Sequence, residues 1–182
     1  MKKSKVFSLS FCAIMASISI VLTIYEVNLP IFNVALYGLP LVFVSILFGP
    51  RYGFLTGLIA GSVEQIMKGL SIQSFVWIIA PLAWGGLSGV VYHGLRMVFN
   101  DNKEYKKVIF LTISIFLSIL VANIANSAAM AIFAYTKDPI TSFGAFVLYA
   151  FSRMISIPLH IIVYVPLCYL VCEKLNKHLI RN

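Results

Sequence analysis

The sequence predicts an all-α membrane protein with six transmembrane helices in one domain that spans residues 1–182. The first indication is the composition, which is 60% hydrophobic and 11% charged, whereas soluble domains carry about 25% charged residues. The second is a series of long apolar runs with short polar stretches between them. The third is the clustering of lysine and arginine at the ends of these runs, which for a net charge of +8 favours a membrane over a nucleic-acid partner.

Six apolar segments are long enough to cross or nearly cross a bilayer. The first follows a lysine-rich start that could belong to a signal peptide, but no small-residue cleavage site follows, so a retained helix is expected. The second and third are short, and Gly49-Pro50 interrupts the chain between them. An alternative joins these two into a re-entrant pair. The expected helices cover about 6–24, 34–48, 52–67, 74–99, 106–135 and 143–171.

The distribution of basic residues predicts the orientation of this bundle. Eleven of the 14 lysines and arginines fall on one side of the predicted helices, and Lys68 and Lys137 fall on the other. Arg153 lies inside the last segment. Because short cytoplasmic loops are enriched in lysine and arginine, both termini are expected in the cytoplasm.

Two segments carry glycines at close spacing. The third has Gly53, Gly57 and Gly61 four residues apart, and the fourth has Gly85 and Gly86 followed by Gly89. Small residues at this spacing let helix backbones approach each other in lipid. Packing within the chain is the expected role of these glycines.

The first segment also has a face of small residues, formed by Cys12, Ala13, Ala16 and Ser17. Such a face can pack inside the bundle, or it can dock on another membrane protein. The residues themselves leave both interpretations open.

A few polar side chains lie within the predicted spans, where ionisable groups cost several kcal/mol unless they meet a partner, a cavity or water. A rise of 1.5 Å per residue places Asn126 and Arg153 roughly 14 and 15 Å below the outer ends of their helices. This predicts an outward-facing pocket with a rim at Glu64 and Gln65 and a floor at His160. An Arg153–Glu64 ion pair that joins two helices is the alternative, and His160 can equally be a hydrogen-bonded core residue. The polar set comprises Glu64, Gln65, Asn123, Asn126, Arg153 and His160.

Aromatic residues start two of the predicted helices near the outer surface. Trp77 lies in the fourth and Tyr37 in the second, while Trp84 lies deeper and is expected in the core. Tryptophan and tyrosine are common interfacial anchors, and they can also form a flat wall for a ring-bearing ligand.

Several classes of protein are made unlikely by missing motifs. The sequence has no G-x-x-x-x-G-K-[ST] phosphate loop, no H-E-x-x-H and no G-x-S-x-G with catalytic partners. The three cysteines show no metal-ligand spacing. We therefore expect a non-enzymatic protein without a metal or cofactor.

The stretch from Leu39 to Gly61, LPLVFVSILFGPRYGFLTGLIAG, together with six short spans and a small-residue face on the first, resembles the substrate-binding S component of energy-coupling-factor (ECF) vitamin transporters. The last segment, with Arg153 and Pro158, looks like the folate-type branch. Ala13-x3-Ser17 departs mildly from the alanine-x3-alanine docking pattern of that family. Glu64 stands where folate-type relatives often carry aspartate, which leaves the vitamin open.

The resemblance implies a membrane-embedded subunit that captures a vitamin from outside with high affinity. It would dock through Cys12, Ala13, Ala16 and Ser17 on a transmembrane scaffold subunit with two ATPase subunits, and the loop 25–35 would help gate the pocket. The vitamin would be folate-like, or another small ring-bearing or anionic one. The implied ligand contacts are Arg153 for an anionic group, Asn123 and Asn126 for ring edges, Glu64 and Gln65 at the rim, Trp77 for stacking, with His160 and Tyr37 as further contacts.

Three alternatives remain at this point. The chain can be an S component for another vitamin, such as pantothenate, cobalamin or hydroxymethylpyrimidine. It can also be a stand-alone permease for a small solute, or a membrane scaffold protein with a structural Arg153–Glu64 pair.

Overall fold

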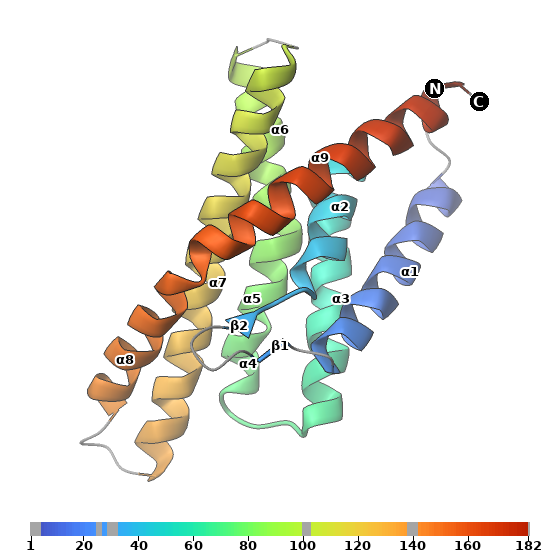
Figure 1. Cartoon of the computed structure of the whole chain (residues 1–182). Helices are drawn as coiled ribbons and strands as arrows, with labels where there is room; N and C mark the ends of the chain where they lie inside the picture. Colours follow the sequence, from blue (N-terminus) through green and yellow to red (C-terminus); the bar gives the residue numbers. More distant parts are fainter. Residues whose placement is uncertain (1–4, 25–26, 29–32, 100–102, 138–141, 182) are drawn as a thin grey trace.

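The structure is a computed structural model that describes residues 5–24, 27–28, 33–99, 103–137 and 142–181. It is a helical bundle with one short two-stranded sheet, and the start of α1 and the end of α9 lie at the same end of it (Figure 1). The elements are α1 (Lys5–Ile24), β1 (Val27–Asn28), β2 (Asn33–Val34), α2 (Gly38–Phe48), α3 (Pro50–Lys68), α4 (Ser74–Trp77), α5 (Ile79–Leu82), η1 (Ala83–Leu87), α6 (Ser88–Phe99), α7 (Glu104–Lys137), α8 (Ser142–Ile155) and α9 (Ile157–Arg181).

Within the described residues, four segments are long and apolar enough to cross a membrane, judged by length and composition: Lys5–Thr23, Ser74–Phe99, Glu104–Tyr135 and Ile157–Leu175. The four segments overlap the first, fourth, fifth and sixth predicted spans, the sixth only over residues 157–171, so the multi-pass helical class is confirmed. The remaining predicted spans correspond to the shorter α2 and to α3.

Helix α2 explains why the second predicted span looked short. Its 11 residues extend only about 16 Å at 1.5 Å per residue, roughly half of the hydrocarbon core. It starts after the β1–β2 pair, in which Val27 faces Val34. It ends at Gly49, whose φ of 98° is open to glycine and strained for other residues. Pro50 then starts α3, a favoured position for proline.

The prediction that the last span is one helix was wrong. The structure breaks it at Ser156, between α8 and α9. Pro158 lies directly after the break, and proline removes a backbone donor and clashes with the carbonyl four residues earlier. As a result Arg153 lies in the last turn of α8, where backbone carbonyls are left without helical partners.

The glycines pack inside the bundle, as expected. A Cβ atom on Gly53 would lie 2.0 Å from the carbonyl oxygen of Gly85, and one on Gly57 would lie 2.4 Å from that of Pro81. The backbones of α3 and of the α5–η1 segment therefore touch directly. The centre of the bundle is α2, whose Leu41 and Val42 are fully buried.

Candidate functional site

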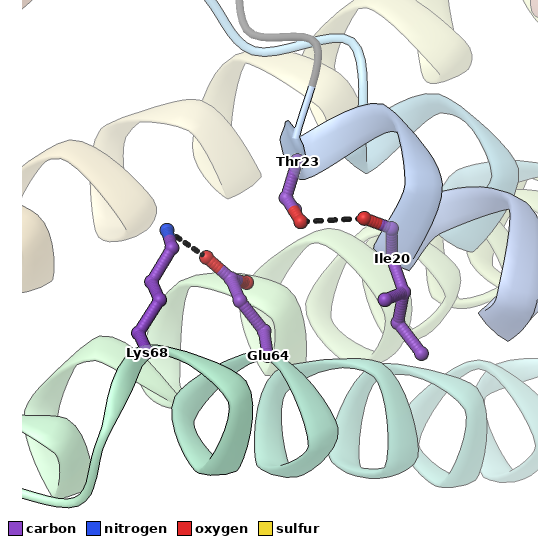
Figure 2. A network of polar contacts seen from close by, with 4 residues as sticks. All are labelled: Ile20, Thr23, Glu64 and Lys68. Carbon is purple, nitrogen blue, oxygen red and sulfur yellow. Dashed lines mark hydrogen bonds and ion pairs between the residues drawn. The ribbon is translucent and has the colours of Figure 1, made fainter.

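Glu64 is paired within its own helix. Its Oε1 lies 2.6 Å from the Nζ of Lys68, one turn later on α3, and the two side chains are 12% and 52% exposed. Figure 2 shows this pair beneath the end of α1, where the Thr23 hydroxyl donates to the carbonyl of Ile20 at 2.6 Å. The alternative Arg153–Glu64 ion pair is thus not formed, because Glu64 has a nearer cation.

Gln65, the next residue, is in the opposite situation. Its side chain is only 2% exposed, and its Oε1 has no hydrogen-bond partner within the part of the chain that the structure describes. A buried acceptor without a donor costs about 1–3 kcal/mol. Gln65 therefore offers an unused, water-excluded acceptor on α3.

Arg153 and Asn126 are also unpartnered. Among the described residues, neither the Arg153 guanidinium nor the Asn126 amide makes a hydrogen bond or ion pair, and both residues are partly buried. An arginine at membrane depth normally meets a partner or water. The two side chains come from α8 and α7, which pack along each other.

Asn123 has a partner that the sequence did not suggest. Its Nδ2 donates to the backbone carbonyl of Arg153 at 3.1 Å. The same carbonyl accepts from the Ser156 hydroxyl at 2.7 Å. Asn123 thereby caps the end of α8 and holds the backbone of Arg153 against α7.

His160 is 3% exposed, and both of its ring nitrogens are engaged. Its Nε2 accepts from the backbone N–H of Ala35 at 3.0 Å, and its Nδ1 lies 2.8 Å from the carbonyl of Ser156. The hydrogen-bonded core histidine is therefore the arrangement found here. Tyr37 is 7% exposed, and its backbone carbonyl accepts from the Ser19 hydroxyl at 2.7 Å.

Two further observations complete the geometry. Trp77 ends the short helix α4 and is partly exposed. No group of three or more His, Cys, Asp or Glu side chains that could hold a metal ion occurs in the described ranges.

Comparisons with known proteins agree with this architecture. A model of the family described as thiamine transporter protein (Thia_YuaJ) matches residues 9–179. The chain belongs to this family. The fold is similar to the solved structure of ThiT from Listeria monocytogenes, with a TM-score of 0.73 and 18% identity over 96% of this chain and 98% of that one. No curated protein matches the chain significantly.

Membership of the thiamine transporter protein family confirms the predicted S-component type and the expectation of a transport protein rather than an enzyme. It does not support the folate-type branch. The alternative of an S component for another vitamin agrees better with the match. The features that looked folate-like, Arg153 and Pro158, mark the α8–α9 break and do not by themselves specify a vitamin.

The docking face predicted on the first helix is divided in this family member. Cys12 and Ala16 are 1% and 2% exposed and face the interior of the bundle, whereas Ala13 and Ser17 are exposed. The docking role implied for these four residues stays a prediction, and in the isolated chain Ala13 and Ser17 are the accessible members of the set. Helix α1 packs against both α2 and α3, and Ala16 belongs to the hydrophobic core of the bundle.

Sequence reasoning missed Tyr164. Its side chain is fully buried, and its hydroxyl donates to the backbone carbonyl of Ala35. A signal was present, because residues four apart share a helix face and Tyr164 follows His160 by four. The contact with Ala35, 129 residues away, has no local signature.

Proposed function

We propose that this chain is the membrane-embedded, high-affinity binding subunit of an ECF-type importer for thiamine, or for a close derivative with the same aminopyrimidine ring. It captures the ligand from outside and delivers it through a transmembrane scaffold with two ATPase subunits. It lies in the plasma membrane with both termini in the cytoplasm. The family match supports the vitamin class, and the basic residues support the orientation.

The buried Oε1 of Gln65 is the observation that carries the proposal. It is an acceptor without a donor among the described residues. The exocyclic amino group of an aminopyrimidine is a donor, and pairing the two would recover the 1–3 kcal/mol that the orphaned acceptor costs. A site built to hydrogen-bond such a group discriminates strongly against analogues that lack it.

Arg153 and Asn126 supply the complementary donors. Thiamine carries a positive charge on its thiazolium ring, so Arg153 is unsuited to that ring and suited to acceptors. These are the pyrimidine nitrogens, the hydroxyl group, or the phosphate of a phosphorylated thiamine, which the guanidinium fork binds well. The Glu64 carboxylate is the counter-charge for the cationic ring, and it must then loosen from Lys68.

The remaining predicted contacts take lesser roles in this proposal. Trp77 is partly exposed and stacks on the flat ligand. Asn123 acts through the backbone of Arg153, and Tyr37 contributes a buried wall. His160 contacts the protein rather than the ligand.

The test is native mass spectrometry with small-molecule extraction on the detergent-purified chain, followed by titration with thiamine, thiamine monophosphate, aminomethylpyrimidine and folate. We expect thiamine or its monophosphate at one ligand per chain. Arg153→Ala should weaken binding at least about tenfold, as for a lost charge-assisted hydrogen bond. Arg51→Ala removes the same charge from an exposed position at the start of α3 and is the matched control.

Two results would overturn the proposal. One is a chain that purifies empty and ignores all four compounds. The other is binding of folate alone, which would return the chain to the folate-type ligand class. Equal affinities in Arg153→Ala and Arg51→Ala would remove Arg153 from the site while leaving the ligand to be named by extraction.

A further inference from the structure

Three buried aromatic side chains lie together where η1 meets α9. Trp84 on η1 is 2% exposed, and His160 and Tyr164 on α9 are 3% and 0% exposed. The ring centroids of Trp84 and Tyr164 are 4.9 Å apart, and those of His160 and Tyr164 are 5.7 Å apart. The packing of these rings fixes the orientation of the His160 ring nitrogens and of the Tyr164 hydroxyl, both on α9.

The polar groups of His160 and Tyr164 both form hydrogen bonds with the same residue, Ala35, which follows β2. The backbone N–H of Ala35 donates to His160 Nε2 at 3.0 Å, and the Tyr164 hydroxyl donates to the Ala35 carbonyl. One residue of the junction between β2 and α2 thus has its two backbone groups paired by two side chains from the last helix. A buried backbone group without its partner is costly, so this double pairing is a strong positional restraint.

The tautomer of His160 extends the restraint further along the chain. Because Nε2 accepts a hydrogen bond, the neutral ring carries its proton on Nδ1. Nδ1–H therefore donates to the carbonyl of Ser156 at 2.8 Å. Ser156 is the residue at the α8–α9 break, and its hydroxyl and N–H donate to the carbonyl of Arg153 at 2.7 and 3.2 Å.

A continuous series of hydrogen bonds consequently joins the β2–α2 junction to the helix end that carries Arg153. We propose that His160 and Tyr164 form a latch that fixes residues 35–37 relative to Arg153, and that His160 is a positioning residue for ligand binding rather than a ligand contact. The effect on binding rests on the proposed function, whereas the latch itself is a property of the unliganded chain.

The latch predicts different effects for variants that remove a hydrogen bond to Ala35 and for variants that keep both of these bonds. Tyr164→Phe keeps the ring against Trp84 and removes only the hydroxyl. His160→Leu removes both ring nitrogens, and His160→Gln keeps an amide oxygen that can accept from Ala35. Ser118→Ala is the matched control, because its hydroxyl is also fully buried but donates within α7, to Ser114.

The experiment has one readout without ligand and one with ligand. Hydrogen–deuterium exchange on the unliganded chain follows the amides of residues 35–39 and of Leu41, since Pro40 has no amide hydrogen. Stopped-flow fluorescence then gives the association and dissociation rates of thiamine. In Tyr164→Phe and His160→Leu we expect exchange about tenfold faster and thiamine dissociation about tenfold faster, with association changed less than about twofold, since a buried group has lost its partner. His160→Gln should lie near the parent in both readouts, and Ser118→Ala should equal the parent.

The two readouts separate the possible failures. Unchanged exchange in Tyr164→Phe and His160→Leu overturns the latch. Faster exchange with unchanged thiamine rates overturns the positioning role. A parent chain that binds no thiamine overturns the proposed function, while the exchange data still decide whether the latch exists.

Discussion

The side-chain nitrogen of Asn123 on α7 lies 3.1 Å from the backbone oxygen of Arg153 on α8 and donates a hydrogen bond to it. This bond crosses between two helices and ends at the carbonyl that Ser156 also uses. The position of the Arg153 backbone is therefore set by α7 as much as by its own helix.

Replacing Asn123 tests this relationship. Asn123→Ala leaves the Arg153 carbonyl with its Ser156 partners alone, so we expect a loss of about 1 kcal/mol in the free energy of unfolding. Ligand affinity should fall by about fivefold, because Arg153 loses its support. Unfolding by SDS titration and calorimetric titration measure the two effects. Ser127→Ala, which removes a hydroxyl donating to the Asn123 carbonyl, should leave the affinity unchanged.

Gln65 gives a prediction in which stability and binding change in opposite directions. Gln65→Leu removes a buried acceptor that has no partner among the described residues, so the unliganded chain should gain about 1 kcal/mol of stability. Ligand affinity should fall at least about tenfold, since the ligand's donor then has no acceptor. Thermal unfolding with and without thiamine measures both quantities. A stability loss in Gln65→Leu would show that the side chain serves the fold instead.

The Glu64–Lys68 pair predicts an effect of ligand charge. An i, i+4 pair of this kind contributes only about 0.3–0.5 kcal/mol, so Lys68→Met should barely change stability. Affinity for cationic thiamine should rise a few-fold, because Glu64 no longer has a competing cation. Affinity for an uncharged aminopyrimidine should stay the same, and Glu64→Gln should reverse the gain. Parallel titrations of the two compounds distinguish charge from general structural effects.

The glycine contact between α3 and η1 predicts a contrast between two similar substitutions. Gly53→Ala places a Cβ atom 2.0 Å from the Gly85 carbonyl, so it should destabilise the fold by about 1–3 kcal/mol. Gly94→Ala, on α6, meets no heavy atom within 4 Å. It should be neutral or stabilise by up to about 1 kcal/mol, because alanine favours the helix. Equal effects of the two substitutions would contradict the close approach of the helices.

The apolar runs predicted most of the architecture because helix length in a bilayer is set by its thickness. The fourth predicted span has the same first and last residues as the observed segment, Ser74 and Phe99. The break at Ser156 was missed since apolarity continues through it, although Pro158 was a local signal. The pairing of Glu64 with Lys68 also had a local signal, their spacing of four residues.

Other features depend on tertiary packing and had no local signal. Cys12 and Ala13 are neighbours on a helix that is apolar all round, so composition does not tell which of them faces the bundle. The contacts of Ala35 with His160 and Tyr164 join positions 125 and 129 residues apart. The polar set itself was predictable, because polar side chains are rare within membrane helices, but its pairing was not.

Helix α7 has a consequence for the choice of lipid in any of these measurements. Its 34 residues extend about 51 Å, well beyond a hydrocarbon core of about 30 Å. A helix that long must tilt or project into the headgroup region, and the balance depends on bilayer thickness. Asn126 lies on this helix, and so does Asn123, whose side chain donates to the backbone carbonyl of Arg153. Acyl-chain length is therefore an experimental variable, and nanodiscs of thin and thick lipids should give different ligand affinities for the same chain.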